Sequence, residues 1–179
     1  MIKESDLKLL IKALAFAADK HKNQRRKNVD ASPYINHPIS LASILCNEAH
    51  VTDTNVICGA LLHDTVEDTE TTAVELTREF GQEICDIVMD VTDDKTIEDK
   101  QKRKQLQIEH AAHISEPAKL VKLADKISNL RDVANDPPAD WDLERRRQYF
   151  DWAKQVIDQL RGVHPDLELL FDQAYSLRT

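Results

Sequence analysis

Apolar residues recur every three or four positions through most of this chain, between residues that start and stop helices. Ser5 and Asp53 are suited to cap helix N-termini. Thr72 and Glu75 form a capping-box pattern, and Gly81 is suited to end the helix that begins there. Three glycines and 5% aromatic residues are too few for a typical sandwich or barrel. We therefore predict an all-α fold, a single compact domain over residues 1–179. The predicted helices cover about residues 6–20, 38–48, 54–68, 72–80, 82–91, 98–113, 117–133, 143–160 and 165–179.

The chain is acidic, with a formal net charge of -8 and a pI of about 5.3. Such a charge gives no general attraction for nucleic acid or for an anionic membrane. No apolar run reaches the roughly 18 residues of a membrane span, and the first residues lack a signal-peptide core. Cys46, Cys58 and Cys85 lack C-x-x-C spacing and sit among apolar residues, which favours reduced core thiols. We expect a soluble, cytoplasmic protein.

Ionisable residues cluster at 63–68, directly after the apolar run 56–60. His63, Asp64, Glu67 and Asp68 therefore emerge from a segment that should be buried. Charge is costly there without a partner, and a bound divalent cation would offset the cost. If one helix runs through the stretch, His63 lies four residues before Glu67 and Asp64 four before Asp68, so the two pairs share one surface of the helix. The alternative is a helix C-terminus with scattered solvated acids.

Two further residues stand where a purely structural role is awkward. His37 precedes Pro38, which suits the first position of a helix, and Asp125 borders the apolar surface of the predicted helix 117–133. Alone, His37 is also compatible with a capping or core role, and Asp125 with an internal salt bridge. With His63 and Asp64 they form a set of two imidazoles and two carboxylates. This ligand set suits Mn(II) or Fe(II) and is less typical of the closed sites that bind zinc. Glu67 and Asp68, one turn beyond His63 and Asp64, would orient a water molecule and move its protons.

Positive charge is densest in the loop at residues 21–27, which contains Arg25, Arg26 and Lys27. One interpretation is a solvated surface. The other is a phosphate clamp, because the guanidinium fork matches phosphate oxygens. The predicted helix 98–113 is also highly charged, with few large apolar groups, and we expect it to lie on the outside.

The order His37, His63-Asp64, Asp125 resembles the HD superfamily of metal-dependent phosphohydrolases. Further stretches resemble the hydrolase domain of the RelA/SpoT alarmone enzymes, and most closely the stand-alone small alarmone hydrolases of metazoa and bacteria. These stretches are Arg26-Lys27 and residues 34–38, 60–68, 91–95 and 122–126. The resemblance extends over about residues 15–161, most of the chain, and implies a helical HD-domain fold.

The resemblance also implies an activity, which is hydrolysis of ppGpp or pppGpp at the ribose 3′ position to give GDP or GTP and pyrophosphate. The implied cofactor is one Mn(II) per chain, and its implied ligands are His37, His63, Asp64 and Asp125. Water activation is implied for Glu67 and Asp68. The implied nucleotide contacts are Arg26 and Lys27, with Asn129 at the ribose or base and Arg145 and Tyr149 near the phosphates. The run Arg145-Arg146-Arg147 leaves the register of that contact open by one residue.

Two other functions stay open at this stage. One is a phosphatase that acts on another phosphorylated nucleotide such as NADPH, and the other is a non-catalytic HD domain that binds nucleotide. The chain ends at Thr179, so we expect no synthetase domain and no alarmone synthesis. The segment Asp136-Pro137-Pro138 departs from the residues usual in the family. The sequence leaves the oligomeric state open, a homodimer being one alternative.

Overall fold

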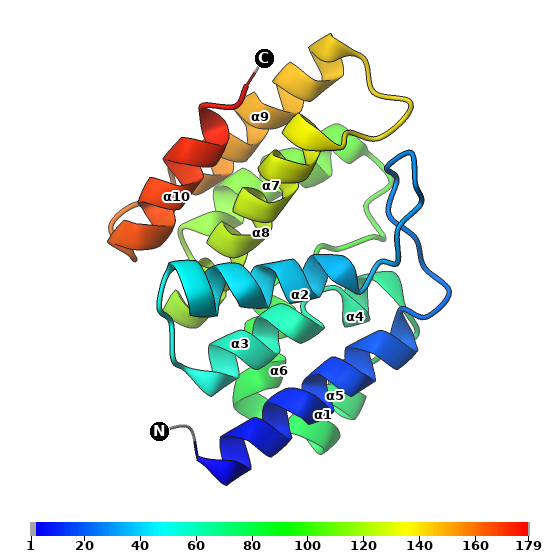
Figure 1. The fold of residues 1–179 in the computed structure, drawn as a ribbon, viewed down its shortest axis with the longest axis vertical. Helices are drawn as coiled ribbons and strands as arrows, with labels where there is room; N and C mark the ends of the chain where they lie inside the picture. Colours follow the sequence, from blue (N-terminus) through cyan, green and yellow to red (C-terminus); the bar gives the residue numbers. More distant parts are fainter. Residues whose placement is uncertain (1–2, 179) are drawn as a thin grey trace.

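The computed structural model describes residues 3–178 as a set of helices with no strand in that range, which confirms the all-α prediction (Figure 1). An isolated β-bridge between Arg25 and Pro33 closes the loop after the first helix. The helices are α1 (Glu4–Lys20), α2 (Asn36–Ser43), η1 (Ile44–Glu48), α3 (Thr54–Leu62), α4 (Thr65–Asp68), α5 (Ala73–Phe80), α6 (Gln82–Val91), α7 (Lys100–Ala111), α8 (Glu116–Asn135), α9 (Leu143–Ile157) and α10 (Pro165–Tyr175).

Two of the three predicted side-chain caps are confirmed. The Asp53 carboxylate accepts hydrogen bonds from two backbone amides at the start of α3, and the Thr72 hydroxyl accepts one from Glu75 at the start of α5. Gly81 separates α5 from α6 with φ of 87°, a region that favours glycine. The predicted cap at Ser5 is wrong, because α1 already begins at Glu4 and the Ser5 hydroxyl donates to Asp6 instead.

The predicted helix 54–68 is interrupted after Leu62. The Nδ1 of His63 donates to the carbonyl of Ala60 at 2.8 Å, and the hydroxyl of Thr65 donates to the carbonyl of Leu62 at 2.7 Å. These side chains occupy carbonyls that backbone amides of a continuing helix would use, so the chain turns before α4 begins at Thr65. The turn places His63 and Asp64 at the junction of two helices rather than along one.

The predicted helix 38–48 differs in a second way, because its last turn widens into the π-helical segment η1. The amide of Ala49 donates to the carbonyl of Ile44 at 2.9 Å, five residues back. Ile44 and the adjacent Leu45 are both buried. The wider turn lets these consecutive side chains face the core.

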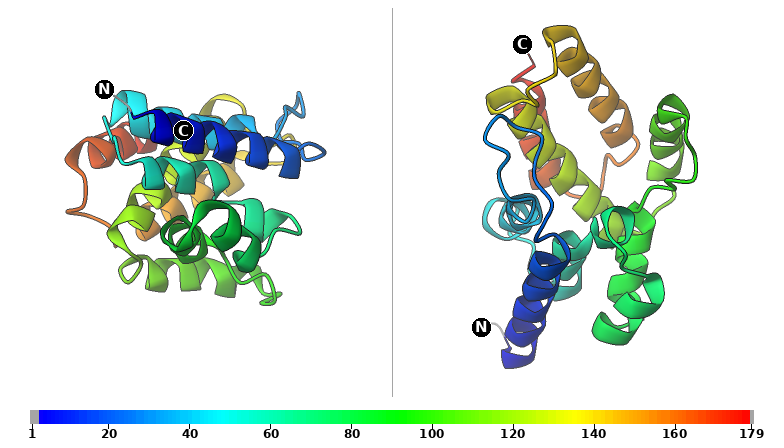
Figure 2. Two further views of the ribbon diagram at one scale, coloured as in Figure 1. Left: turned by 90° about the horizontal axis from the view of Figure 1, so that it is seen from below. Right: turned by 90° about the vertical axis from the view of Figure 1, so that its right-hand side faces the viewer.

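Helix α8 packs against α2, α3, α6, α9 and α10, and Figure 2 shows the arrangement of the helices from two further sides. One hydrophobic cluster joins α2, η1, α8, α9 and α10, and the other joins α1 and α5. Helices α3 and α6 contribute residues to both clusters. All seven residues 56–62 of α3 are buried. The charged helix α7 lies on the outside as predicted, with Ala111 its one buried residue. Within residues 3–178, no helix is both long and apolar enough to cross a membrane.

The cysteines are free, and two of the three lie in the core as predicted. Cys58 and Cys85 are buried, whereas Cys46 is only half-buried. Burial raises the pKa of the Cys58 thiol to about 12. Such a thiol is unreactive at neutral pH.

Gly59 marks the closest approach of α3 and α6. A Cβ at this position would lie 2.5 Å from Cγ2 of Ile87, a clash that the packed interface cannot absorb. Alanine gains about 1 kcal/mol of helix propensity over glycine. Overpacking in a core costs about 1–3 kcal/mol, occasionally more. We therefore predict that Gly59→Ala lowers the free energy of unfolding, measured by urea denaturation.

A double-mutant cycle tests the cause of that loss. Ile87→Ala alone should cost about 2–5 kcal/mol because it leaves a cavity. In the Gly59→Ala, Ile87→Ala double variant the new methyl group occupies part of that cavity. The two losses should therefore sum to more than the loss of the double variant. Simple additivity would contradict the proposed clash.

Candidate active site

Two imidazoles and two carboxylates meet at one place between α2, α3, α4 and α8. Nε2 of His37 lies 3.2 Å from Oδ1 of Asp125 and 4.0 Å from Oδ2 of Asp64. Nε2 of His63 lies 2.9 Å from the same oxygen of Asp64. Ligand atoms of His37, His63 and Asp125 all lie within 4.8 Å of one another. The fold therefore brings together all four residues that the sequence singled out as metal ligands.

His63 is oriented as a metal-binding histidine would be. The Ala60 carbonyl can only accept, so Nδ1 carries a proton, and Nε2 is the nitrogen that offers a lone pair when the ring is neutral. That Nε2 is buried and has no hydrogen-bond partner within residues 3–178, although it faces Asp64. A buried lone pair beside a carboxylate is unfavourable unless a proton or a metal ion lies between them. Histidines that bind a metal through one ring nitrogen typically donate the N–H of the other nitrogen to a group such as a backbone carbonyl, as His63 does. The residues present therefore fit a divalent cation.

The charges of the cluster depend on one another. Burial lowers the pKa of His37, and the carboxylate of Asp125 offsets this only in part. Burial also opposes protonation of His63, but Asp64 and Asp125 together raise its pKa to about 9, so without a metal ion Nε2 of His63 carries a proton at neutral pH. A cation bound at Nε2 would displace that proton. Burial disfavours ionised Asp64 and Asp125, yet His63 and Lys126 hold the pKa of these carboxyls below its usual range. The result is a pair of ionised carboxylates beside imidazole nitrogens, which is a mixed nitrogen and oxygen donor set.

Neighbouring side chains fix both carboxylates of the cluster. The hydroxyl of Tyr34 donates to Oδ2 of Asp64, and burial raises the pKa of Tyr34, which keeps this donor protonated. The ammonium of Lys126 lies 3.1 Å from Oδ2 of Asp125. It also lies 4.4 Å from the ring centroid of Trp152, a favourable cation–π geometry.

The acidic pair Glu67 and Asp68 lies on α4, one turn beyond the cluster. Oε2 of Glu67 accepts the backbone amide of Asp93 at 3.1 Å, and Lys95 forms ion pairs with both acids. Burial raises the pKa of Glu67 to about 7, despite the opposing hydrogen bond from Asp93. A carboxyl with a pKa near neutrality is suited to accept and release protons.

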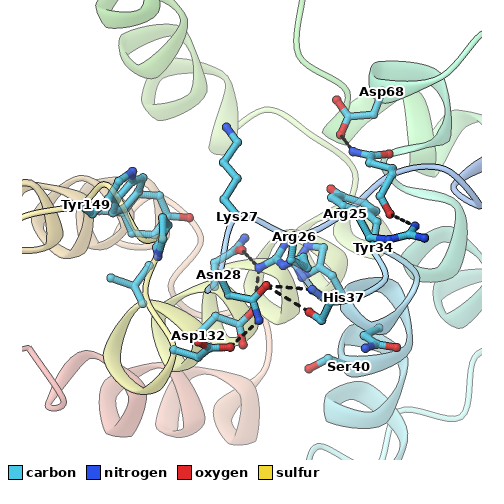
Figure 3. Close-up of a pocket in the computed structure, with 18 residues that line it drawn as sticks. Arg25, Arg26, Lys27, Asn28, Tyr34, His37, Ser40, Asp68, Asp132 and Tyr149 are labelled. Atoms are coloured by element: carbon cyan, nitrogen blue, oxygen red, sulfur yellow. Dashed lines mark hydrogen bonds and ion pairs between the residues drawn. The ribbon is translucent and has the colours of Figure 1, made fainter. Parts of the chain in front are cut away.

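Two cavities meet at this cluster. The smaller, of about 200 Å³, contains the four candidate ligands and the acidic pair. The larger, of about 370 Å³, opens beside it between the 24–36 loop and the C-terminal half of α8 (Figure 3). Residues that line both cavities are Arg26, Tyr34, His37, Asp68 and Asn129.

Four of the five predicted substrate contacts line the larger cavity, namely Arg26, Lys27, Asn129 and Tyr149. The guanidinium of Arg26 donates to Asp132 at 2.6 Å and to Asn129 at 3.2 Å. Asn129 in turn donates to Asp125 at 2.6 Å. Arg26 is therefore connected to the candidate metal cluster through Asn129.

Arg145 lies outside this cavity. It borders a third one of about 560 Å³, which shares Tyr149 with the larger cavity. The guanidinium of Arg145 lies 4.7 Å from the ring centroid of Trp141 and 3.3 Å from Asp140. Arg145 thus borders the site from the far side of Tyr149.

Several polar residues of the site were not singled out from the sequence. Lys122 and Lys126 are buried on α8, and charged residues within that apolar helix were a signal that could have identified them. Gln24 and Lys95 both hold Asp68, across 44 and 27 residues of sequence. No spacing rule connects positions so far apart.

The helical fold and this cluster define a class, the helical proteins with a histidine and aspartate metal site. Residues 13–150 match the HD domain family. This match covers more than half of the chain, and the chain belongs to that family.

Comparison with individual proteins gives a more specific family. The chain is 52% identical over 171 residues to the guanosine-3′,5′-bis(diphosphate) 3′-pyrophosphohydrolase MESH1 of Xenopus tropicalis, and the alignment covers 96% of this chain and 95% of the relative. It is 51% identical over 174 residues to human MESH1, covering 97% of each. A solved structure, described as a metazoan orthologue of SpoT that hydrolyses ppGpp, superposes with a TM-score of 0.92 at 47% identity, covering 99% of this chain and 98% of that one. The resemblance stated from the motifs is confirmed.

Proposed function

We propose that the chain is a (p)ppGpp 3′-pyrophosphohydrolase that converts ppGpp to GDP and pyrophosphate, and pppGpp to GTP and pyrophosphate. The observation that carries the proposal is the arrangement of the smaller cavity. It places the four candidate ligands beside the Glu67-Asp68 pair, and Arg26 lines the same cavity. The relatives that carry this name align over nearly the whole chain. Both facts support the same reaction.

We propose that His37, His63, Asp64 and Asp125 hold one divalent cation, Mn(II). Two imidazole nitrogens and two carboxylates leave positions open in an octahedron, which suits this ion. A bound cation would supply positive charge to phosphoryl oxygens and lower the pKa of a water. Tyr34 and Lys126 keep the two carboxylates in place by direct contact.

Within this scheme Glu67 and Asp68 orient the attacking water and take up its proton. Glu67 is the better base, because burial raises its pKa to about 7. The backbone amide of Asp93 donates to Oε2 of Glu67 at 3.1 Å, and Oε1 lies 3.8 Å from the ammonium of Lys95. Both acids line the cavity that contains the candidate ligands.

Arg26 and Lys27 provide the positive charge for a substrate that carries several phosphates, with Asn129, Tyr149 and Arg145 as further nucleotide contacts. Arg26→Ala should raise KM for ppGpp roughly 10- to 100-fold with unchanged metal content, because it removes a charge-assisted hydrogen bond. Steady-state kinetics with parallel metal analysis measures both.

A matched control is Arg131→Ala. Like Arg26, Arg131 donates to a carboxylate: its guanidinium, on α8, lies 2.8 Å from the carboxylate of Glu48. It lines none of the three cavities. We expect its KM to stay at the wild-type value. A KM for Arg26→Ala equal to that of this control would exclude Arg26 from the substrate site.

The third cavity favours a second candidate, a phosphatase acting on NADPH. Its walls combine Trp141, Tyr149 and Trp152 with Lys100, Arg103 and Lys104, which suits an additional base and phosphate. The purified chain should be assayed with ppGpp and with NADPH under Mn(II). We expect the higher kcat/KM for ppGpp; turnover of NADPH alone would replace the proposal, and turnover of neither would favour a non-catalytic nucleotide-binding domain.

We propose a cytoplasmic location and a single domain. Free Cys46, Cys58 and Cys85 suit a reducing compartment. Helices α3 and α6 contribute residues to both hydrophobic clusters, which supports one continuous core. The acidic charge supports a small-molecule substrate rather than nucleic acid as the partner.

A further inference from the structure

The carboxylate of Asp68 is held from two sides. Its Oδ1 accepts from the ammonium of Lys95. Its Oδ2 accepts from Nε2 of Gln24 at 2.9 Å, the contact drawn as a dashed line at Asp68 in Figure 3. Lys95 is half exposed, with 51% of its side chain accessible. Gln24 comes from the loop that follows α1, where it lines the larger cavity. Two donors from distant parts of the chain thus fix the plane of one carboxylate.

Gln24 is itself held firmly. Its backbone amide donates to the carbonyl of His21 at 2.9 Å, and its carbonyl accepts from the amide of Tyr34 at 3.1 Å. Its side-chain Oε1 lies 2.7 Å from Nδ1 of His21. A carboxylate paired with Lys95 only accepts hydrogen bonds, so the NH2 group of Gln24 faces Asp68. Oε1 therefore faces His21, and Nδ1 of His21 must carry the proton.

His21 is almost completely buried, with 2% of its surface exposed. Its ring lies 4.8 Å from the ring of Tyr34 at an interplanar angle of 34°. The hydroxyl of Tyr34 donates to Asp64. One buried imidazole therefore supports Asp68 through Gln24 and packs against the residue that holds Asp64.

We propose that His21 and Gln24 are positioning residues for Asp68. The inference rests on the proposed function, in which Asp68 takes part in moving a proton. A group that moves a proton must lie within hydrogen-bond reach of it, and a small displacement is costly. The buried His21 fixes that geometry through Gln24, which holds the carboxylate oxygen of Asp68 that Lys95 does not.

The test is a double-mutant cycle on kcat for ppGpp. Gln24→Leu should lower kcat about 10- to 100-fold, the value of a hydrogen bond to a charged group, with KM and metal content unchanged. In an Asp68→Asn background the same substitution should change kcat less than about twofold, because the carboxylate it positions is gone. His21→Leu should behave like Gln24→Leu. His21→Asn should restore most of the loss, because its amide nitrogen corresponds to Nδ1.

A matched control is Gln105→Leu, since Gln105 also donates to a carboxylate at 2.9 Å, that of Glu109 on the exposed face of α7. We expect it to keep wild-type kinetics. Equal losses from Gln24→Leu in the wild-type and Asp68→Asn backgrounds, or a change in KM alone, would overturn the inference. A wild-type chain that fails to hydrolyse ppGpp overturns the proposed function. Wild-type turnover retained in Gln24→Leu overturns only the positioning role.

Discussion

Replacing Glu67 by Gln and Asp68 by Asn is expected to lower kcat for ppGpp by at least about a hundredfold while metal and nucleotide remain bound. A positioned base or acid contributes roughly 10²- to 10⁴-fold to a reaction of this kind. Neither residue lies among the candidate ligands, and both amides nearly keep the shape of the acids they replace. Pyrophosphate release, metal content and nucleotide binding by calorimetry measure the three quantities on one preparation.

A charge-matched control separates this effect from a change in net charge. Glu83→Gln with Asp86→Asn removes the same two negative charges from the exposed surface of α6. This variant should retain wild-type turnover. If the Glu67, Asp68 variant loses its metal, the two acids belong to the ligand set and the proposed division of roles is wrong.

His63→Ala is expected to weaken metal binding by more than about a hundredfold and to abolish turnover. Loss of an outer contact to a ligand costs roughly 10- to 100-fold in affinity, and loss of the ligand itself should cost more. Mn(II) should raise the melting temperature of the wild-type chain and leave that of His63→Ala unchanged, because only a cation that binds the folded state stabilises it. Far-ultraviolet circular dichroism verifies that the variant is folded.

The exposed His113, in the turn that follows α7, provides the control. His113→Ala removes an imidazole without touching the cluster, and its thermal shift with Mn(II) should equal that of the wild type. A wild-type thermal shift in His63→Ala would remove His63 from the site.

Much of the fold follows from patterns that act over short distances. The caps at Asp53 and Thr72 and the break at Gly81 involve contacts within a few residues, and each occurs as predicted. The interruption after Leu62 was not predicted, because it depends on the side chain of His63 taking a carbonyl that helix periodicity assigns to a backbone amide.

The candidate site divides in the same way. The ligand types could be predicted because charge within an apolar segment needs a partner, as at Asp64 and Asp125. Contacts set by the tertiary fold could not. Tyr34 beside Asp64 and Gln24 beside Asp68 depend on which helices and loops meet, and the position of Arg145 beyond Tyr149 depends on how α9 packs.

The most direct test of the account is hydrolysis of ppGpp by the purified chain with Mn(II) in water labelled with heavy oxygen. Attack of a water on the 3′-linked phosphorus predicts equal amounts of GDP and pyrophosphate, with the label in pyrophosphate, and loss of the reaction when a chelator removes the metal. Release of orthophosphate, label in the GDP, or turnover that survives the chelator would contradict it.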